Sequence, residues 1–121
     1  MEPWKTDELK IMQVAIPDDG ETPPGALDFT FAPNREFQLL KVAIKFSTTV
    51  TTSENFTATF ASVNGAKFGY VMESDDMQGL TEKVYDYSAA LEYFQKGDSI
   101  NFAFANTDEL EFGLLVTYRE K

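Results

Sequence analysis

The sequence contains no cysteine and no histidine among its 121 residues. Without cysteine the chain can form no disulfide, no thiolate nucleophile and no cysteine-bound zinc or iron–sulfur site. Without histidine it lacks the commonest general base, the usual ligand of transition metals and the side chain that titrates near neutral pH. The two absences exclude most hydrolytic triads, although they leave a carboxylate-based enzyme open.

Clusters of basic residues and long apolar runs are also absent. The 10 Lys and Arg residues are scattered, and the net charge is −10. Because nucleic-acid binders need a basic footprint, we expect no nucleic-acid partner. No apolar stretch approaches the roughly 20 residues of a membrane span, and the first residues lack the pattern of a signal peptide. We therefore expect a protein that is used without crossing a membrane, and its acidity suits a partner with a basic patch.

Short segments in which apolar and polar residues alternate fill most of the chain. The clearest is 36–47, where Leu40, Val42, Ile44 and Phe46 share one parity. A period of two places such residues on one face of a strand. Further strands are expected at 10–16, 27–31, 55–62, 67–73, 81–88, 99–106 and 111–118. The segment 89–94 fits a short helix or a strand equally well.

Eight or nine short strands separated by turns are typical of an antiparallel β-sandwich. We predict an all-β fold of about eight strands that resembles a jelly roll, with an immunoglobulin-like topology as the alternative. The pair Asn64-Gly65 predicts a two-residue hairpin of type I′. Residues 1–25 are interpreted as an N-terminal arm with a loop rich in Pro and Gly, and residues 26–121 as the sandwich domain.

No catalytic, cofactor-binding or metal-binding set is evident in the sequence. A glycosidase needs two carboxylates that face each other across a cleft, and a compact sandwich of this size rarely leaves room for one. We therefore predict a protein that is not an enzyme and that has no cofactor and no metal. The acidic run 73–76 is expected to be a solvated loop, with a calcium site as the alternative. A glycan-binding face would need a row of exposed aromatic residues, for which Tyr85, Tyr87 and Tyr93 are the only candidates.

Apolar residues near the N-terminus are the candidate protein interface. Trp is enriched at interface hot spots, and the chain has one, Trp4. Its alternative role is to cap the end of the core. The predicted interface set consists of Trp4, Leu9, Ile11, Val14 and Ile16.

Several segments carry a resemblance to a known group of proteins. They are 37–44, 51–57, 62–66, 94–100, 105–108 and 113–114. Taken together they resemble the small head decoration or cement proteins of tailed bacteriophages, which have jelly-roll-like folds. The resemblance covers roughly residues 36–119.

The resemblance implies a non-enzymatic virion structural protein that binds the major capsid protein or another virion protein and clamps neighbouring capsomers. It further implies a homodimer or homotrimer on the capsid surface, made in the host cytoplasm, and it brings no catalytic residues. A carbohydrate-binding module and a module of the tail or a fibre are the alternatives.

Overall fold

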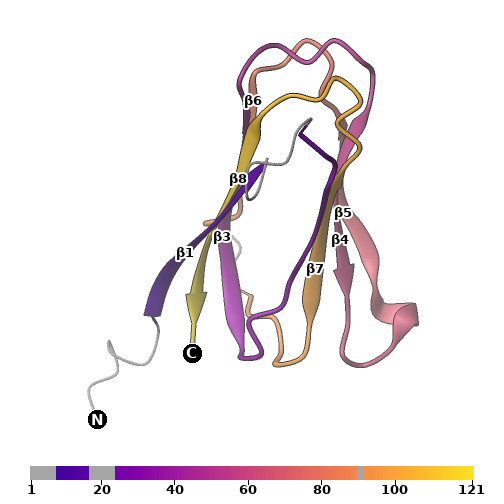
Figure 1. The fold of residues 1–121 in the computed structure, drawn as a ribbon. Coiled ribbons are helices and arrows are strands. Elements are labelled where there is room, and N and C mark those ends of the chain that lie inside the picture. Colours follow the sequence, from indigo (N-terminus) through magenta and orange to yellow (C-terminus); the bar gives the residue numbers. More distant parts are fainter. Residues whose placement is uncertain (1–7, 17–23, 90–91) are drawn as a thin grey trace.

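The computed structural model describes residues 8–16, 24–89 and 92–121, which form eight strands and one 3₁₀ helix (Figure 1). The strands are β1 (Glu8–Ile16), β2 (Leu27–Phe31), β3 (Phe37–Phe46), β4 (Asn55–Ala61), β5 (Tyr70–Asp76), β6 (Glu82–Asp86), β7 (Ser99–Phe104) and β8 (Phe112–Glu120). The 3₁₀ helix, Ala66–Phe68, lies between β4 and β5. The prediction of an all-β fold with about eight strands is confirmed.

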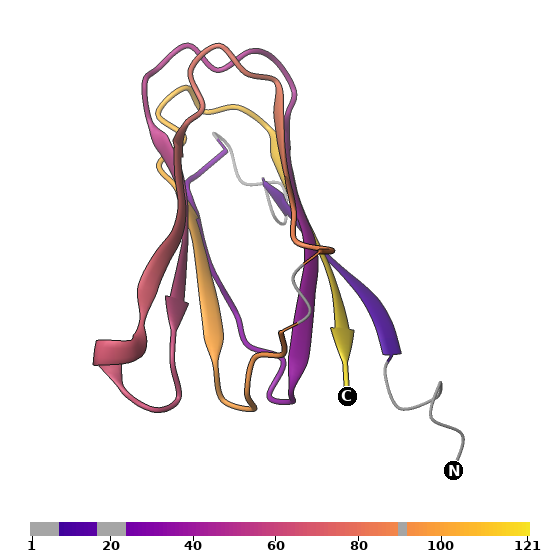
Figure 2. The ribbon, with the colours of Figure 1, turned by 180° about the vertical axis from the view of Figure 1, so that it is seen from behind.

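The strands form two four-stranded antiparallel sheets, with the orders β1-β8-β3-β6 and β2-β7-β4-β5. We call them the first and the second sheet. They lie face to face as two layers (Figures 1 and 2). Six of the seven connections between successive strands pass from one sheet to the other, and only β4 and β5 are direct neighbours. This order is the jelly-roll arrangement, and it differs from the division of strands in an immunoglobulin domain.

The core lies between the two sheets and is largely aromatic. Phe31, Phe37, Phe56 and Phe102 are all fully buried. In β7 and β8 every second side chain points inward, as the alternation predicted. Phe rings fill this space well because each covers a large apolar area with few rotatable bonds.

Strand β3 has one feature that simple alternation did not predict. Its pairing with β8 shifts between Leu39 and Lys41, so that Leu40 is an extra residue in a β-bulge. Phe37 and Leu39 therefore face inward before the bulge, and Val42 faces inward after it. The expectation that Leu40 belongs to the same inward row as Val42 is wrong, because a bulge changes the parity of the strand.

Three local predictions in the second half of the chain are corrected. The turn at Asn64-Gly65 is not a two-residue hairpin, because the 3₁₀ helix lies between the paired strands and only Gly65 has a positive φ there. The returning strand begins at Tyr70 instead of Lys67. Residues 73–76 are the end of strand β5 and not a loop.

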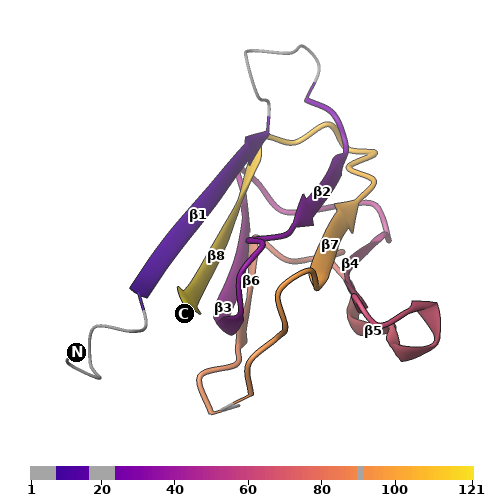
Figure 3. The same cartoon turned by 90° about the horizontal axis from the view of Figure 1, so that it is seen from below.

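Part of the predicted arm is a strand of the first sheet. All nine residues of β1 pair with β8, from Glu8 opposite Glu120 to Ile16 opposite Phe112. The strand expected at 10–16 is thus confirmed and forms the edge of the first sheet, where Figure 3 shows it next to β8. No helix among the described residues is long and apolar enough to cross a membrane.

Candidate functional site

Part of the outer face of the first sheet presents small and apolar side chains in cross-strand rows, whereas the row of Ile11 continues through Thr117, Lys41 and Asp86. One row runs from β1 to β6 through Gln13, Leu115, Ala43 and Val84, each paired with the next. Val84, at its end, is 47% exposed. The residues come together because their strands are neighbours in the sheet, although they are far apart in the chain.

The next row makes this face hollow. It runs through Ala15, Gly113, Lys45 and Glu82. The side chains of Ala15 and Gly113 are only a methyl group and a hydrogen atom, whereas those around them are longer. This difference leaves a shallow open depression of about 630 Å³. Residues of both rows line it, together with Glu111, so the floor is apolar and its margin carries charges of both signs.

The predicted interface residues divide between the two faces of β1. Leu9 and Ile11 point outward and are 61% and 65% exposed. Val14 and Ile16 have the opposite parity, and they pack against the core. Trp4 lies outside the described residues. The predicted set therefore contains two exposed large apolar side chains of β1, together with two residues that pack against the core of the sandwich.

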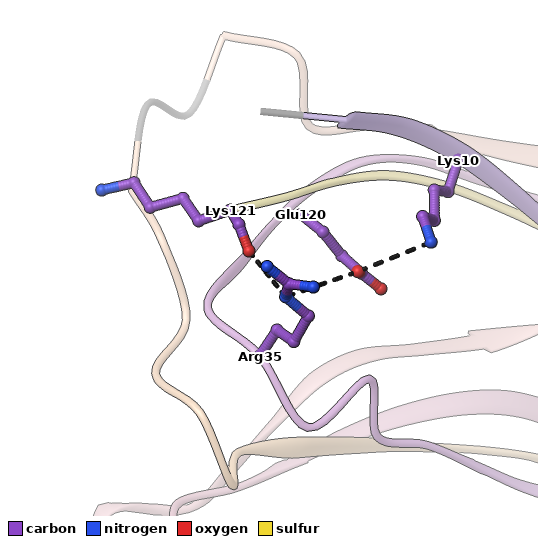
Figure 4. Close-up of polar contacts among 4 residues, drawn as sticks. All are labelled: Lys10, Arg35, Glu120 and Lys121. Atoms are coloured by element: carbon purple, nitrogen blue, oxygen red, sulfur yellow. Dashed lines mark hydrogen bonds and ion pairs between the residues drawn. The ribbon is translucent and has the colours of Figure 1, made fainter. Parts of the chain in front are cut away.

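A cluster of charged residues fixes one end of β1 and the last residues of the chain (Figure 4). Glu120 is buried, and its Oε1 atom lies 3.6 Å from Lys10 Nζ and 3.8 Å from Arg35 Nε. The same Arg35 nitrogen donates a hydrogen bond of 2.7 Å to the backbone oxygen of Lys121. The inward-pointing charge of Lys10 is thereby compensated inside its own chain.

At the opposite edge of the sandwich, β5 and β6 are joined through side chains. The Tyr85 hydroxyl donates to Asp75 at 2.7 Å, and the Tyr87 hydroxyl donates to Glu73 at 2.6 Å. Burial, reinforced by these carboxylates, raises the pKa of both tyrosines above the ordinary range. Tyr85 is only 8% exposed, so the row of exposed aromatic residues that glycan binding requires is not formed.

The acidic run of β5 does not form a metal site in the structure. Asp75 accepts a hydrogen bond from Tyr85 of β6 and Glu73 accepts one from Tyr87, just beyond that strand, whereas Asp76 accepts hydrogen bonds from the Ser53 hydroxyl and from the backbone of Gln78. Alternate residues of a strand point in opposite directions, which explains why Asp76 has different partners from Glu73 and Asp75. Among residues 8–16, 24–89 and 92–121 no three acidic side chains are close enough to hold a metal ion.

A smaller hollow lies next to Tyr87 and is lined by residues of both sheets, among them Leu39 of β3 and Met72 of β5. Its volume is about 220 Å³, and its walls are mostly apolar. It is lined by Leu39, Tyr70, Met72, Tyr87, Glu92 and Phe94. No local sequence pattern indicates this hollow, because its residues come from four separate segments.

No family model matches the chain, and no curated protein matches it either.

Proposed function

We propose that the protein is a non-enzymatic virion structural protein, a decoration or cement protein that binds the major capsid protein lattice and stabilises the head. The observation that carries the proposal is the outer face of the first sheet, where exposed Leu9, Ile11 and Val84 accompany the apolar hollow. Exposed apolar side chains beside a hollow with a polar margin are typical of sites of protein interaction. A rigid jelly roll is a common architecture of capsid proteins.

The energetics of such a face suit attachment to a repeating surface. Leu9 and Ile11 are only 61% and 65% exposed, so burying the rest of each contributes roughly 1–2 kcal/mol before the cost of association. Both side chains stand on a strand that β8 already holds along its whole length, so little backbone entropy is lost on binding. One such contact is weak, but many copies on one shell reinforce one another.

Electrostatics adds selectivity to this contact. The chain carries a net charge of −10, which favours a lattice surface with basic patches and speeds the encounter with it. Lys45, Glu82 and Glu111 at the margin of the hollow supply charges that fix the orientation of a partner. We expect binding to weaken as salt is added, because exposed charges are screened within about 10 Å at 0.1 M salt.

The test is co-sedimentation with phage heads that lack this protein. Ala43→Gln places a polar side chain in the hollow without changing the charge, and it should abolish retention on the heads. Ala103→Gln is the matched control, because Ala103 stands on a central strand at the outer face of the second sheet and is half-buried like Ala43. It should bind like the unmodified protein.

Two results would refute the proposal in different ways. Failure of the unmodified protein to bind any heads would remove the capsid function. Binding that survives Ala43→Gln, or that both substitutions abolish equally, would remove the outer face of the first sheet as the attachment site. Attachment to a tail or fibre protein through the same face is the alternative, and it would appear as co-sedimentation with tails.

A further inference from the structure

The four edge strands of the sandwich differ in how they are protected against pairing with another strand. Charged side chains and short length deter such pairing. Strand β6 has three charges in five residues, and β5 carries three carboxylates in seven. Strand β2 is only five residues long and contains Asp28. These three edges are poor templates for a further strand.

Strand β1 is the exception. It has nine residues, and the six from Ile11 to Ile16 carry no charge. Within the described residues no strand pairs with its outer side, since β1 ends the order of the first sheet. Lys10, whose inward-pointing charge is the usual deterrent, is held against Glu120 of its own chain (Figure 4). Among the residues that the structure describes, this edge is therefore long, nearly neutral and open to a partner strand.

We propose that two copies of the protein pair through β1, antiparallel and around a twofold axis at Met12, to form one eight-stranded sheet. The strand order would be β6-β3-β8-β1-β1-β8-β3-β6. A second copy is the occupant that the edge fits, because this register pairs all nine residues of one β1 with all nine of the other and leaves none unmatched. Twofold dimers are also the commonest oligomers of soluble proteins.

The register is supported by the side chains that it brings together. Residues directly opposite each other in an antiparallel pair lie on the same face. Leu9 of one copy then lies beside the small Ala15 of the second copy, and Ile11 lies beside Gln13. Lys10 meets the uncharged Val14. Like charges are not opposed at any pair along the nine residues, although each chain carries a net charge of −10.

This pairing extends the outer face without covering the hollow. The two copies of Leu9 would lose exposure to solvent against Ala15, and the two hollows would lie on one continuous sheet. The inference does not depend on the proposed capsid function, because it concerns the free protein. A dimer in solution that fails to bind phage heads would leave it intact.

The experiment is a measurement of molar mass by light scattering, from low micromolar to near-millimolar concentration. We expect the mass to rise from one chain, 13.6 kDa, to twice that value. Ile11→Lys should give a folded monomer, because the twofold axis brings the two new lysines close together. Val84→Lys introduces the same charge on the same face but at the opposite edge, and should remain a dimer.

A charge pair tests the register itself. Adding Gln13→Glu to Ile11→Lys places a carboxylate directly opposite each lysine and should restore the dimer. A monomer at every concentration, a dimer that survives Ile11→Lys, a loss of the dimer in Val84→Lys, or no rescue by the double substitution would each overturn the proposal. If Ile11→Lys does not fold, amide exchange of the unmodified protein decides, because β1 amides must exchange more slowly as the concentration rises.

Discussion

The contact between Tyr85 and Asp75 gives a prediction that depends on pH in a characteristic way. The Tyr85 ring packs against Phe56, with 5.9 Å between ring centroids, and its hydroxyl bonds to Asp75. Tyr85→Phe preserves the ring and removes only the hydroxyl. A hydrogen bond to a charged group contributes about 1.5–3 kcal/mol. Because Asp75 is half-buried and water can partly replace the hydroxyl, we expect a loss of about 1.5 kcal/mol at neutral pH, the lower end of that range.

The difference should vanish at alkaline pH. An unfolded tyrosine ionises near pH 10, whereas burial and Asp75 raise the pKa of Tyr85 well above that value in the folded protein. The folded state therefore keeps a proton that the unfolded state releases, so stability falls as pH rises. The loss approaches about 1.4 kcal/mol per pH unit for this one group. The unmodified protein and Tyr85→Phe should then be equally stable near pH 11, about one unit above the ordinary pKa.

The assay is urea denaturation followed by far-UV circular dichroism, from neutral pH to about pH 11, one unit past the tyrosine pKa. Tyr70→Phe is the control, because this hydroxyl lies on an exposed residue at the start of β5, and its effect should be small. A stability difference for Tyr85→Phe that stays constant up to that pH would refute the reasoning. A difference below about 0.5 kcal/mol at neutral pH, the minimum for an intramolecular hydrogen bond, would show that the bond to Asp75 contributes nothing.

Two further predictions concern loops at the ends of the sandwich. Hydrogen bonds from the Thr52 hydroxyl and from the Thr51 and Thr52 amides lower the pKa of Asp108 to about 2, so its contribution is present above its ordinary pKa near 4 and disappears as pH falls toward 2. In Asp108→Asn the melting temperature should therefore fall less between about pH 4 and about pH 2 than it does in the unmodified protein. An equal fall in the two proteins would contradict this. Gly97 has a φ of +96°, and a Cβ there would lie 2.6 Å from Val63 Cγ2. Gly97→Ala should lower stability by at least about 1 kcal/mol in urea denaturation, and a neutral effect would show that the turn is not held in this conformation.

The sequence determined which side chains form the core in the regular strands. In β2, β7 and β8 strict alternation identified the inward residues, among them Phe31, Phe102 and Leu114. This succeeds because the side-chain period of a strand is local and needs no knowledge of its neighbours. Alternation failed at Leu40, since the bulge is defined only by the pairing of β3 with β8.

The acidic run of β5 was misread for a related reason. Three carboxylates in four residues suggest a solvated loop when they are considered alone. In the folded chain Asp75 accepts a hydrogen bond from Tyr85 of the first sheet, and Glu73 accepts one from Tyr87, which follows the same strand. These donors come from residues that do not pair with β5, so no pattern within the acidic run itself indicates them.

For the candidate site, too, the sequence predicted one part and only the tertiary structure revealed the rest. The sequence indicated that Leu9 and Ile11 were apolar residues with a role beyond the core, but it could not separate them from Val14 and Ile16. That separation required the pairing of β1 with β8, which decides which side of the strand faces the core. The hollow beside them consists of residues from four strands and has no signature in the order of the chain.

Alternation by itself determined that this protein is an all-β sandwich, because the side-chain period of a strand is a property of short segments. Composition by itself excluded histidine and cysteine chemistry, because it is a property of the whole chain. Only the tertiary structure decided which strands are neighbours, where the four edges lie and that the charge of Lys10 at the β1 edge is compensated by Glu120. Those properties arise from contacts between residues far apart in the sequence, so no local pattern specifies them.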